Sequence, residues 1–450
     1  MPKFVSSDRS QPYLLPPDMR DWVPEDDLVH FVLEAVERVS MSRFRVNERG
    51  TGSAQYHPRM MLALLVYCYA NGVFGSRRIE RATHRDLCVR YLTADRHPDH
   101  DTICKFRREN FDAVSEAFLQ VLLLARELRL LRVGTVSVDG TKVDANANMR
   151  RGVRHDRAEE LRAQLQGEID GLLAEAERAD TEGSADAQRL PAELSRREAL
   201  KAKLDRASAE LKARAERRAE SERSEYERKV AARDAREGSA KGRRPKPPSG
   251  EPRAEDQVNL TDADSGLMKK SERHEWRQSY NAQAVVDADG SQLVLGCRVS
   301  RSASDRRELV ADVDAVPSAV GTAACALADN GYATGSEVAE LEGRGMEVLV
   351  ATGTEGRRRR HDFRPEPAEE PPPKEPKAEW LKEMQSKLEE EENRERYRLR
   401  KHTVEPVFGV VKQAMGFRQF LLRGIEKVEG EWALVMLAYN CKRLKNLMMA

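Results

Sequence analysis

The chain has 450 residues, of which 34% are charged, and its 77 Lys and Arg residues nearly balance its 76 Asp and Glu residues. This length predicts two or three domains, and a hydrophobic content of 40% is enough for at least one large core. No apolar run approaches the roughly 20 residues of a membrane-spanning helix, and the six cysteines form no close pair typical of a disulfide framework or a zinc ribbon. We therefore expect a protein of the cytoplasm, associated with the nucleoid if it binds DNA.

Residues 1–130 have the pattern of a helical domain. Pro24 and the acids after it suit the first turn of a helix, and the next apolar side chains recur at helical spacing. Capping residues and apolar spacing predict further helices over residues 58–70, over 77–83 after Ser76, and from about 101 or 102 to beyond 111. We predict an all-helical N-terminal domain that binds DNA.

Strand patterns begin after residue 130 and alternate with helical patterns. The β-branched stretch 135–144 predicts a strand, and Asp289 with Gly290 marks the turn of a predicted hairpin. The further strands are predicted over 279–287, 292–301, a stretch ending at 329, and 347–351, with helices over 304–316, 336–344 and 431–449. Such alternation favours one mixed sheet with flanking helices. The fold class is therefore multidomain α+β, with an α/β core over residues 131–154, 256–352 and 397–450.

Two charged segments interrupt this core. Residues 155–255 are rich in Ala, Glu, Arg, Lys and Leu and end in a Pro-rich stretch, which predicts a long exposed helix or helical hairpin followed by a linker. Residues 353–396 combine a run of arginines, three consecutive prolines and a charged helical pattern over 380–392. We predict that both segments are insertions into the core.

Three acids stand at the ends of apolar runs that lie far apart in the chain. Asp139 and Asp329 each follow a predicted strand, and Glu405 begins a later helical pattern. Each acid alone has an ordinary explanation, as a turn residue or as a carboxylate favoured by the helix dipole. Together they match a two-metal site, in which carboxylates hold two hard cations about 3.5–4 Å apart for displacement at phosphorus.

Basic residues surround the third acid and recur in the N-terminal helices. Arg400 and Lys401 precede Glu405, while Lys412 follows it by two helical turns and so lies on nearly the same face, where it could hold a phosphate. Other basic residues predicted to contact DNA are Arg418, Arg77 and Arg107.

Several motifs resemble those of bacterial insertion-sequence DDE transposases. Val-Asp-Gly-Thr at 138–141 and Ala-Asp-Asn-Gly-Tyr at 328–332 resemble the first and second acid regions, and residues 403–412 with 416–418 and 422–424 resemble the third. Residues 57–69, 75–80 and 98–107 resemble the helical domain at the front of these enzymes, and residues 259–262 and 280–283 also fit. The resemblance covers most of the chain apart from the two charged segments.

The resemblance implies an RNase H-like catalytic core in which Asp139, Asp329 and Glu405 are the catalytic and metal-binding triad. It implies Mg2+, with Mn2+ as a substitute, for hydrolysis at each 3′ end of the element and transfer of the freed 3′-OH to target DNA. It also implies double-stranded DNA as partner and a homodimer in the DNA complex. One spacing departs from many relatives, which leave three residues between an arginine and the glutamate. Arg400 leaves four, and Lys401 takes the arginine spacing.

Two alternatives remain open at this point. An aspartyl phosphatase or phosphotransferase would use Asp139 as a nucleophile, but such sites place a second aspartate two residues from the first, where Ser137 stands. A catalytically inactive or repurposed DNA-binding protein derived from a transposase is the other alternative.

Overall fold

The computed structural model describes residues 18–48, 54–182, 189–234, 244–270, 275–353 and 378–449. Most of the predicted second insertion, residues 354–377, therefore lies outside the described residues. In the part of the chain that is described, no helix is both long and apolar enough to cross a membrane.

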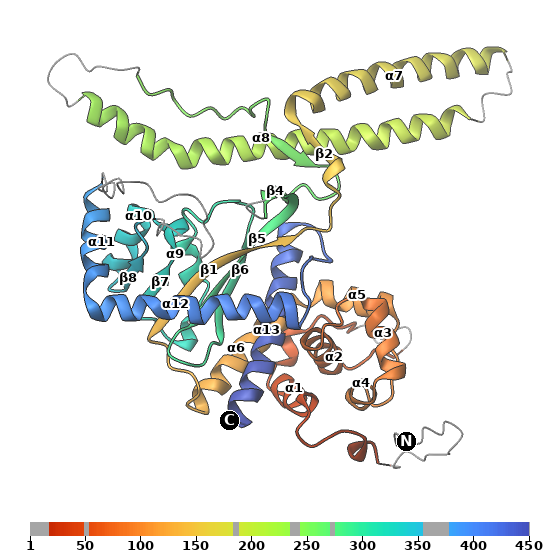
Figure 1. Ribbon diagram of the computed structural model, residues 1–450. Helices are drawn as coiled ribbons and strands as arrows, with labels where there is room; N and C mark the ends of the chain where they lie inside the picture. The colour runs from red at the N-terminus through yellow and green to blue at the C-terminus, as the bar shows by residue number, and fades with distance from the viewer. Residues whose placement is uncertain are drawn as a thin grey trace, which may run out of the picture.

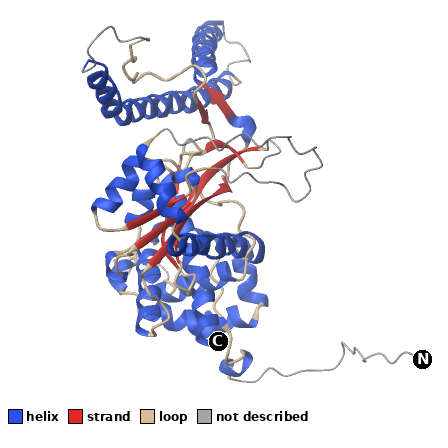
Figure 2. Ribbon diagram, turned by 60° about the vertical axis from the view of Figure 1, so that its left-hand side comes forward, coloured by secondary structure: helices blue, strands red, loops and turns tan. Residues whose placement is uncertain are grey.

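A mixed sheet forms the centre of the molecule (Figures 1 and 2). Its strands are β1 (Thr135–Asp144), β4 (Gly266–Lys269), β5 (Trp276–Asp287), β6 (Val294–Ser300), β7 (Cys325–Ala328) and β8 (Glu347–Val350). β5 pairs antiparallel with β1, β4 and β6, whereas β1, β7 and β8 run parallel in that order. Three antiparallel strands followed by two parallel ones are the RNase H-like arrangement, so this prediction is confirmed.

Helices of the N-terminal region pack against the C-terminal helix. They are α1 (Leu28–Glu37), α2 (Pro58–Ala70), α3 (Ser76–Arg85), α4 (Leu87–Leu92), α5 (His100–Glu109) and α6 (Phe111–Glu127), and α13 spans Ile425–Met449. α13 contacts α1, α2 and α6 on one side and β6 on another. On α13, the buried Trp432 donates its Nε1–H to the carbonyl of Gln283 in β5 at 2.9 Å. The helical region and the sheet therefore share one continuous hydrophobic core.

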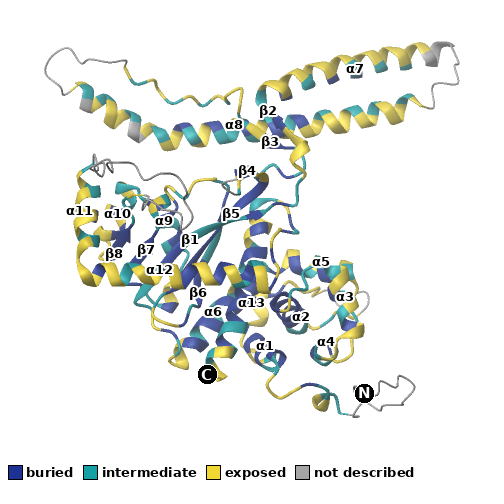
Figure 3. Cartoon of the chain, viewed as in Figure 1, coloured by how far each residue is buried: buried dark blue, intermediate teal, exposed yellow. Residues whose placement is uncertain are grey.

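The first insertion is a helical hairpin that projects from the sheet (Figures 1 and 3). It consists of α7 (His155–Glu182) and the longer α8 (Leu190–Asp234), and the short antiparallel pair of β2 (Gly152–Arg154) and β3 (Gln257–Asn259) closes its base. A small apolar cluster joins the two helices near this base, ion pairs such as Arg162–Asp205 and Arg197–Glu168 join them as well, and most of their remaining surface is exposed. The predicted charged helical insertion is confirmed as a hairpin.

A long helix carries the third acid across the sheet. After α9 (Leu309–Asp314), α10 (Gly335–Gly343) and α11 (Glu379–Glu389), the helix α12 (Glu391–Gly409) packs against β1, β5 and β7. It continues into η7 (Val410–Ala414), a turn of π-helix. α12 runs through the predicted boundary at residue 396, so the end of the second insertion and the core share one helix.

Several predicted helix boundaries differ from the structure. The helix predicted from about residue 101 to beyond 111 is divided at Asn110 into α5 and α6. α9 is shorter than the predicted helix 304–316, because Arg307 has a φ of +67°, a left-handed conformation that a right-handed helix cannot include. The cap of α5 is Asp99, whose carboxylate accepts the backbone N–H of Thr102 at 2.8 Å. α13 begins at Ile425, six residues before the predicted start at 431.

Candidate active site

The first two acids lie side by side on neighbouring parallel strands. Ser137 in β1 is opposite Leu327 in the parallel strand β7. Asp139 and Asp329 each follow two residues later in the chain, so the register brings them to the same level. Asp329 directly follows β7, whereas Asp139 lies inside β1, which continues to Asp144, and so does not end a strand as predicted. Asp329 caps the one-turn helix η6 (Asn330–Tyr332) and accepts the N–H of Gly331 at 2.7 Å.

A fourth acid, Asp305, lies beside this pair. Its Oδ1 accepts hydrogen bonds from Asn281 Nδ2 at 2.7 Å and from Gln283 Nε2 at 3.0 Å, both on β5. A Cβ atom on Gly140 would lie 2.8 Å from Oδ1 of Asp305, and one on Gly331 would lie 3.3 Å from Oδ2. The carboxylate of Asp305 thus lies beside Gly140 of β1 and Gly331 of η6, close to Asp139 and Asp329. The sequence offered no specific signal for Asp305, because a polar turn with Ser and Asp is equally typical of a helix cap.

Arg400 connects the first acid to the third. Its Nη1 lies 3.5 Å from Oδ2 of Asp139, and its Nη2 lies 3.8 Å from Oε1 of Glu405. The Arg400 side chain is 12% exposed and that of Asp139 is 19% exposed, whereas the Glu405 side chain is 57% exposed. Glu405 therefore stands at the open rim of the site, with the guanidinium between it and the buried acid.

Burial and a neighbouring charge set the ionisation of Asp139. Burial raises the pKa of Asp139 to about 7, the charge of Asp329 adds to the rise, and the guanidinium of Arg400 opposes it. The charge of Asp305 raises this pKa further. Like charges raise one another's pKa only at short range, so these causes indicate a concentrated negative site that favours a cation.

A network of hydrogen bonds holds the segments that carry the acids. Tyr332 donates its hydroxyl hydrogen to Oε1 of Gln283, whose amide nitrogen in turn donates to Asp305. Tyr397 on α12 donates to the carbonyl of Ala328, the residue before Asp329, at 3.1 Å. These contacts fix the strand end and the helix relative to each other.

Lys412 reaches the same strand from the π-turn η7. Its Nζ donates to Oγ1 of Thr141 and, at 3.2 Å, to the carbonyl of Lys142, within three residues of Asp139. Burial, followed by the charge of Lys270, lowers the pKa of Lys412. π-turns inside helices often occur at functional sites, and this one aims a partly buried cation at the strand that carries the first acid.

The other predicted DNA-contacting residues are divided between the surface and the core. Lys401, Arg418 and Arg77 are exposed, and Arg418 donates from Nε to the carbonyl of Lys412 at 3.1 Å. Arg107 corrects the prediction, because it is only 4% exposed and donates to the hydroxyl of Tyr69 at 2.8 Å. Tyr69 in turn donates to the buried Glu431 of α13 at 3.1 Å. Arg107 is therefore a structural residue that joins the N-terminal helices to α13.

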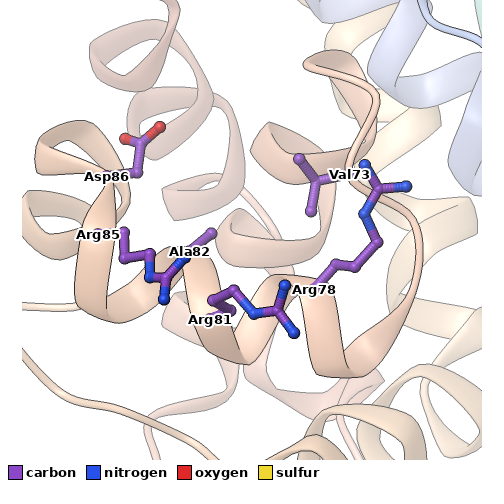
Figure 4. Close-up of a pocket in the computed structure, with 6 residues that line it drawn as sticks. All are labelled: Val73, Arg78, Arg81, Ala82, Arg85 and Asp86. Carbon is purple, nitrogen blue, oxygen red and sulfur yellow. The ribbon is translucent and has the colours of Figure 1, made fainter.

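A basic pocket on α3 was not singled out by its sequence. Arg78, Arg81 and Arg85 line a cavity of about 310 Å³ together with Val73, Ala82 and Asp86 (Figure 4). The three arginines are exposed and stand three and four residues apart, so they share one side of the helix. The opposite side holds the buried Ile79. The helical spacing of the arginines in this segment is the sequence signal from which the pocket could have been predicted.

The donor set of the candidate site suits a hard divalent cation. Asp139, Asp329 and Glu405 offer carboxylate oxygens, the ligands that Mg2+ prefers. The described residues nevertheless contain no ready group of three or more acidic, His or Cys side chains that could hold a metal. Glu405 meets Arg400 instead, so a metal held by all three acids requires the Arg400 guanidinium to move.

Two family models match the chain. The model described as a transposase DDE domain matches residues 245–441, and the one described as a transposase domain (DUF772) matches residues 17–109. The first range includes Asp329 and Glu405, whereas Asp139 precedes it. No curated protein and no solved structure gives a significant match. The two matches follow the helical region and the RNase H-like sheet in chain order, and the chain therefore belongs to the insertion-sequence transposases with a DDE domain.

Proposed function

We propose that this protein cleaves DNA at the ends of an insertion sequence and transfers the 3′ ends to target DNA, with Asp139, Asp329 and Glu405 as the acid triad. The observation that carries the proposal is the parallel register of β1 and β7, which brings Asp139 beside Asp329. Their proximity contributes to the raised pKa of Asp139. Two coupled carboxylates, one inside β1 and one directly after β7, with a third on a helix across them, suit displacement at phosphorus.

Asp139, Asp329 and Glu405 would hold Mg2+, with Mn2+ as a substitute. Bound there, the metal would stabilise the attacking and leaving oxygens of an in-line displacement. Asp305 is held by two amide donors and so keeps its carboxylate beside Gly140 and Gly331, close to Asp139 and Asp329. Asp305 is thus a positioning residue for the acids and adds negative charge to the cation site.

Basic residues on three sides of the acids would bind the DNA backbone. From η7, Lys412 donates a hydrogen bond to the strand of Asp139. The exposed Lys401 lies on α12, and the exposed Arg418 follows η7. Arg400 neutralises the buried acid and so keeps the site from repelling phosphates. Farther away, Arg77 and the arginine side of α3 offer a second basic surface for an element end.

Cleavage of two ends requires one catalytic site for each, so we propose a homodimer in the DNA complex. It would act in the cytoplasm, on the DNA of the nucleoid. A DNA-binding protein without cleavage activity is the second candidate. It is favoured by the contact of Arg400 with Glu405, which keeps that acid from joining the other two.

The deciding experiment uses a plasmid in which a marker is flanked by the DNA that borders this gene. Purified full-length protein is incubated with it and Mg2+, and 3′-end cleavage and strand joining are measured. We expect both products from the unchanged protein and neither from Asp139→Ala. Glu389→Ala removes an exposed acid on α11 and serves as the matched control. Binding without cleavage by the unchanged protein would select the second candidate, and full activity of Asp139→Ala would refute the proposed site.

A further inference from the structure

A groove of about 740 Å³ lies between the hairpin insertion and the core. One wall is the C-terminal part of α8, and another is the segment that returns from it, which runs alongside α8 in Figure 1. The third wall is the loop after β6. Its charged lining residues are Glu222, Lys229, Lys246, Arg253, Arg306 and Arg307.

Ion pairs fasten the walls of this groove to each other. Arg301, just after β6, contacts Glu210 of α8 at 3.0 Å and Asp264 at 2.8 Å. Arg218 of α8 pairs with Asp256 of the returning segment through two bonds of 3.1 Å. The wall that belongs to α8 is therefore tied once to the core and once to the segment that returns from it.

The groove lining is strongly basic. It contains five cationic side chains and one acid, Glu222, although α8 as a whole mixes both signs. Lys246, Arg253 and Arg306 are exposed, and the prolines beside Lys246 carry no N–H donor and hold an extended backbone. An elongated, rigid and cationic groove fits a polyanion with regularly spaced charges, as in a nucleic-acid backbone.

The loop that forms the third wall of the groove also carries an acid of the candidate active site. Arg306 and Arg307 directly follow Asp305, whose carboxylate lies beside Gly140 and Gly331. Arg307 has the left-handed φ of +67° that ends this loop. A DNA strand whose phosphate reaches the acids would thus pass the basic side chains within a few residues of Asp305.

We propose that this groove binds the phosphate backbone of the duplex that is being cleaved, so that the hairpin insertion is a DNA clamp of the active site. The inference rests on the proposed function and adds a binding role for the insertion. Because phosphate contacts carry no sequence information, the groove would hold element-end DNA and unrelated DNA equally. Sequence discrimination would come from other surfaces.

The test is a binding titration of full-length protein, by fluorescence anisotropy in EDTA, so that no cleavage is needed for the readout. The probes are a labelled duplex with the element end and an unrelated duplex of equal length. The groove variant is Lys246→Gln with Arg306→Gln. The matched control is Arg196→Gln with Arg206→Gln, which removes the same charge from exposed positions of α8 outside the groove.

We expect the groove variant to bind both duplexes about tenfold more weakly at moderate salt, and the slope of log K against log salt to fall by about 0.9 for each lost phosphate contact. The control should match the unchanged protein. Unaltered affinity of the groove variant, as expected if the groove instead receives an acidic protein, would overturn the inference, as would a loss confined to element-end DNA. Cleavage in Mg2+ is scored separately, so failure of the proposed function is distinguishable from failure of this inference.

Discussion

The Nη1 atom of Arg400 lies 3.5 Å from Oδ2 of Asp139, so this partly buried acid has a cationic partner on the helix that carries Glu405. The same guanidinium reaches Glu405 at 3.8 Å. Arg400 thereby couples β1 to α12 and occupies the space between two acids that would share a metal. Its charge and a bound divalent cation would stabilise the same carboxylates.

Arg400→Gln should therefore lower the unfolding temperature in EDTA at pH 8, because the charge of Asp139 then lacks its partner. Loss of one partly buried ion pair lowers the free energy of unfolding by about 1–3 kcal/mol, and we expect less here because the Glu405 side chain is exposed. Mg2+ should raise the melting temperature of this variant more than that of the unchanged protein. Thermal unfolding with and without Mg2+ measures both effects. Arg398→Gln, an exposed neighbour on α12, should behave like the unchanged protein.

Asp139→Asn should stabilise the protein in EDTA, and more so at pH 8 than at pH 5. The folded-state pKa of Asp139 is raised to about 7 from 3.8, so folding favours its protonated form. The loss of stability from ionised Asp139 is absent below the unfolded-state pKa of 3.8, grows between that pH and the folded-state pKa of about 7, and is complete above it. Asn avoids the cost, so its advantage should be about 2 kcal/mol larger at pH 8 than at pH 5.

Urea unfolding of Asp139→Asn and the unchanged protein at the two pH values measures this difference. A constant advantage across the range would contradict a raised pKa at this position. The same variant should lose end cleavage, which separates the stability of the site from its activity.

Asp305→Asn should raise the Mg2+ concentration needed for half-maximal end cleavage by about tenfold, the range found when residues that orient metal ligands are changed. The asparagine keeps the shape and an amide oxygen that can still accept from Asn281 and Gln283, but it removes a charge that acts on Asp139. A Mg2+ titration of the cleavage rate is the measurement. Glu383→Gln on α11 provides a control with an exposed acid. An unchanged titration would remove Asp305 from the site.

Arg107→Met should destabilise the fold by about 3–5 kcal/mol, because it leaves Glu431 buried without its cation. Burial raises the pKa of Glu431, and the charge of Arg107 opposes that rise. Arg108→Met changes the exposed neighbour and should cost less than 0.5 kcal/mol, as roughly expected for surface positions. Urea unfolding monitored by circular dichroism compares the two. Equal stability of both variants would show that the buried network contributes little.

Arg81→Gln with Arg85→Gln should weaken binding of element-end duplex by about tenfold and reduce its salt dependence, because both side chains lie in the basic pocket of α3. Anisotropy titrations at several salt concentrations measure the change. Arg108→Gln with Arg129→Gln removes the same charge from exposed positions outside this pocket and should have no effect. A loss in the control equal to that in the variant would indicate only a general charge effect.

The sequence by itself determined the elements with strong local periodicity, the mixed sheet with flanking helices and the long charged helical insertion, and its motifs resembled those of an RNase H-like core. It also placed Asp139 and Asp329 after apolar runs with strand character, because alternation of apolar side chains and a following turn are local signals. Asp329 does follow β7, whereas Asp139 lies inside β1. Only the tertiary structure decided which distant side chains meet. The local sequence of Arg107 is that of an exposed helix residue. In the fold, Tyr69 contacts both Arg107 and Glu431, which lies 324 positions later in the chain. Asp305 and Arg400 join the acids through pairings of β5 and α12 with β1, which depend on contacts that no local pattern encodes.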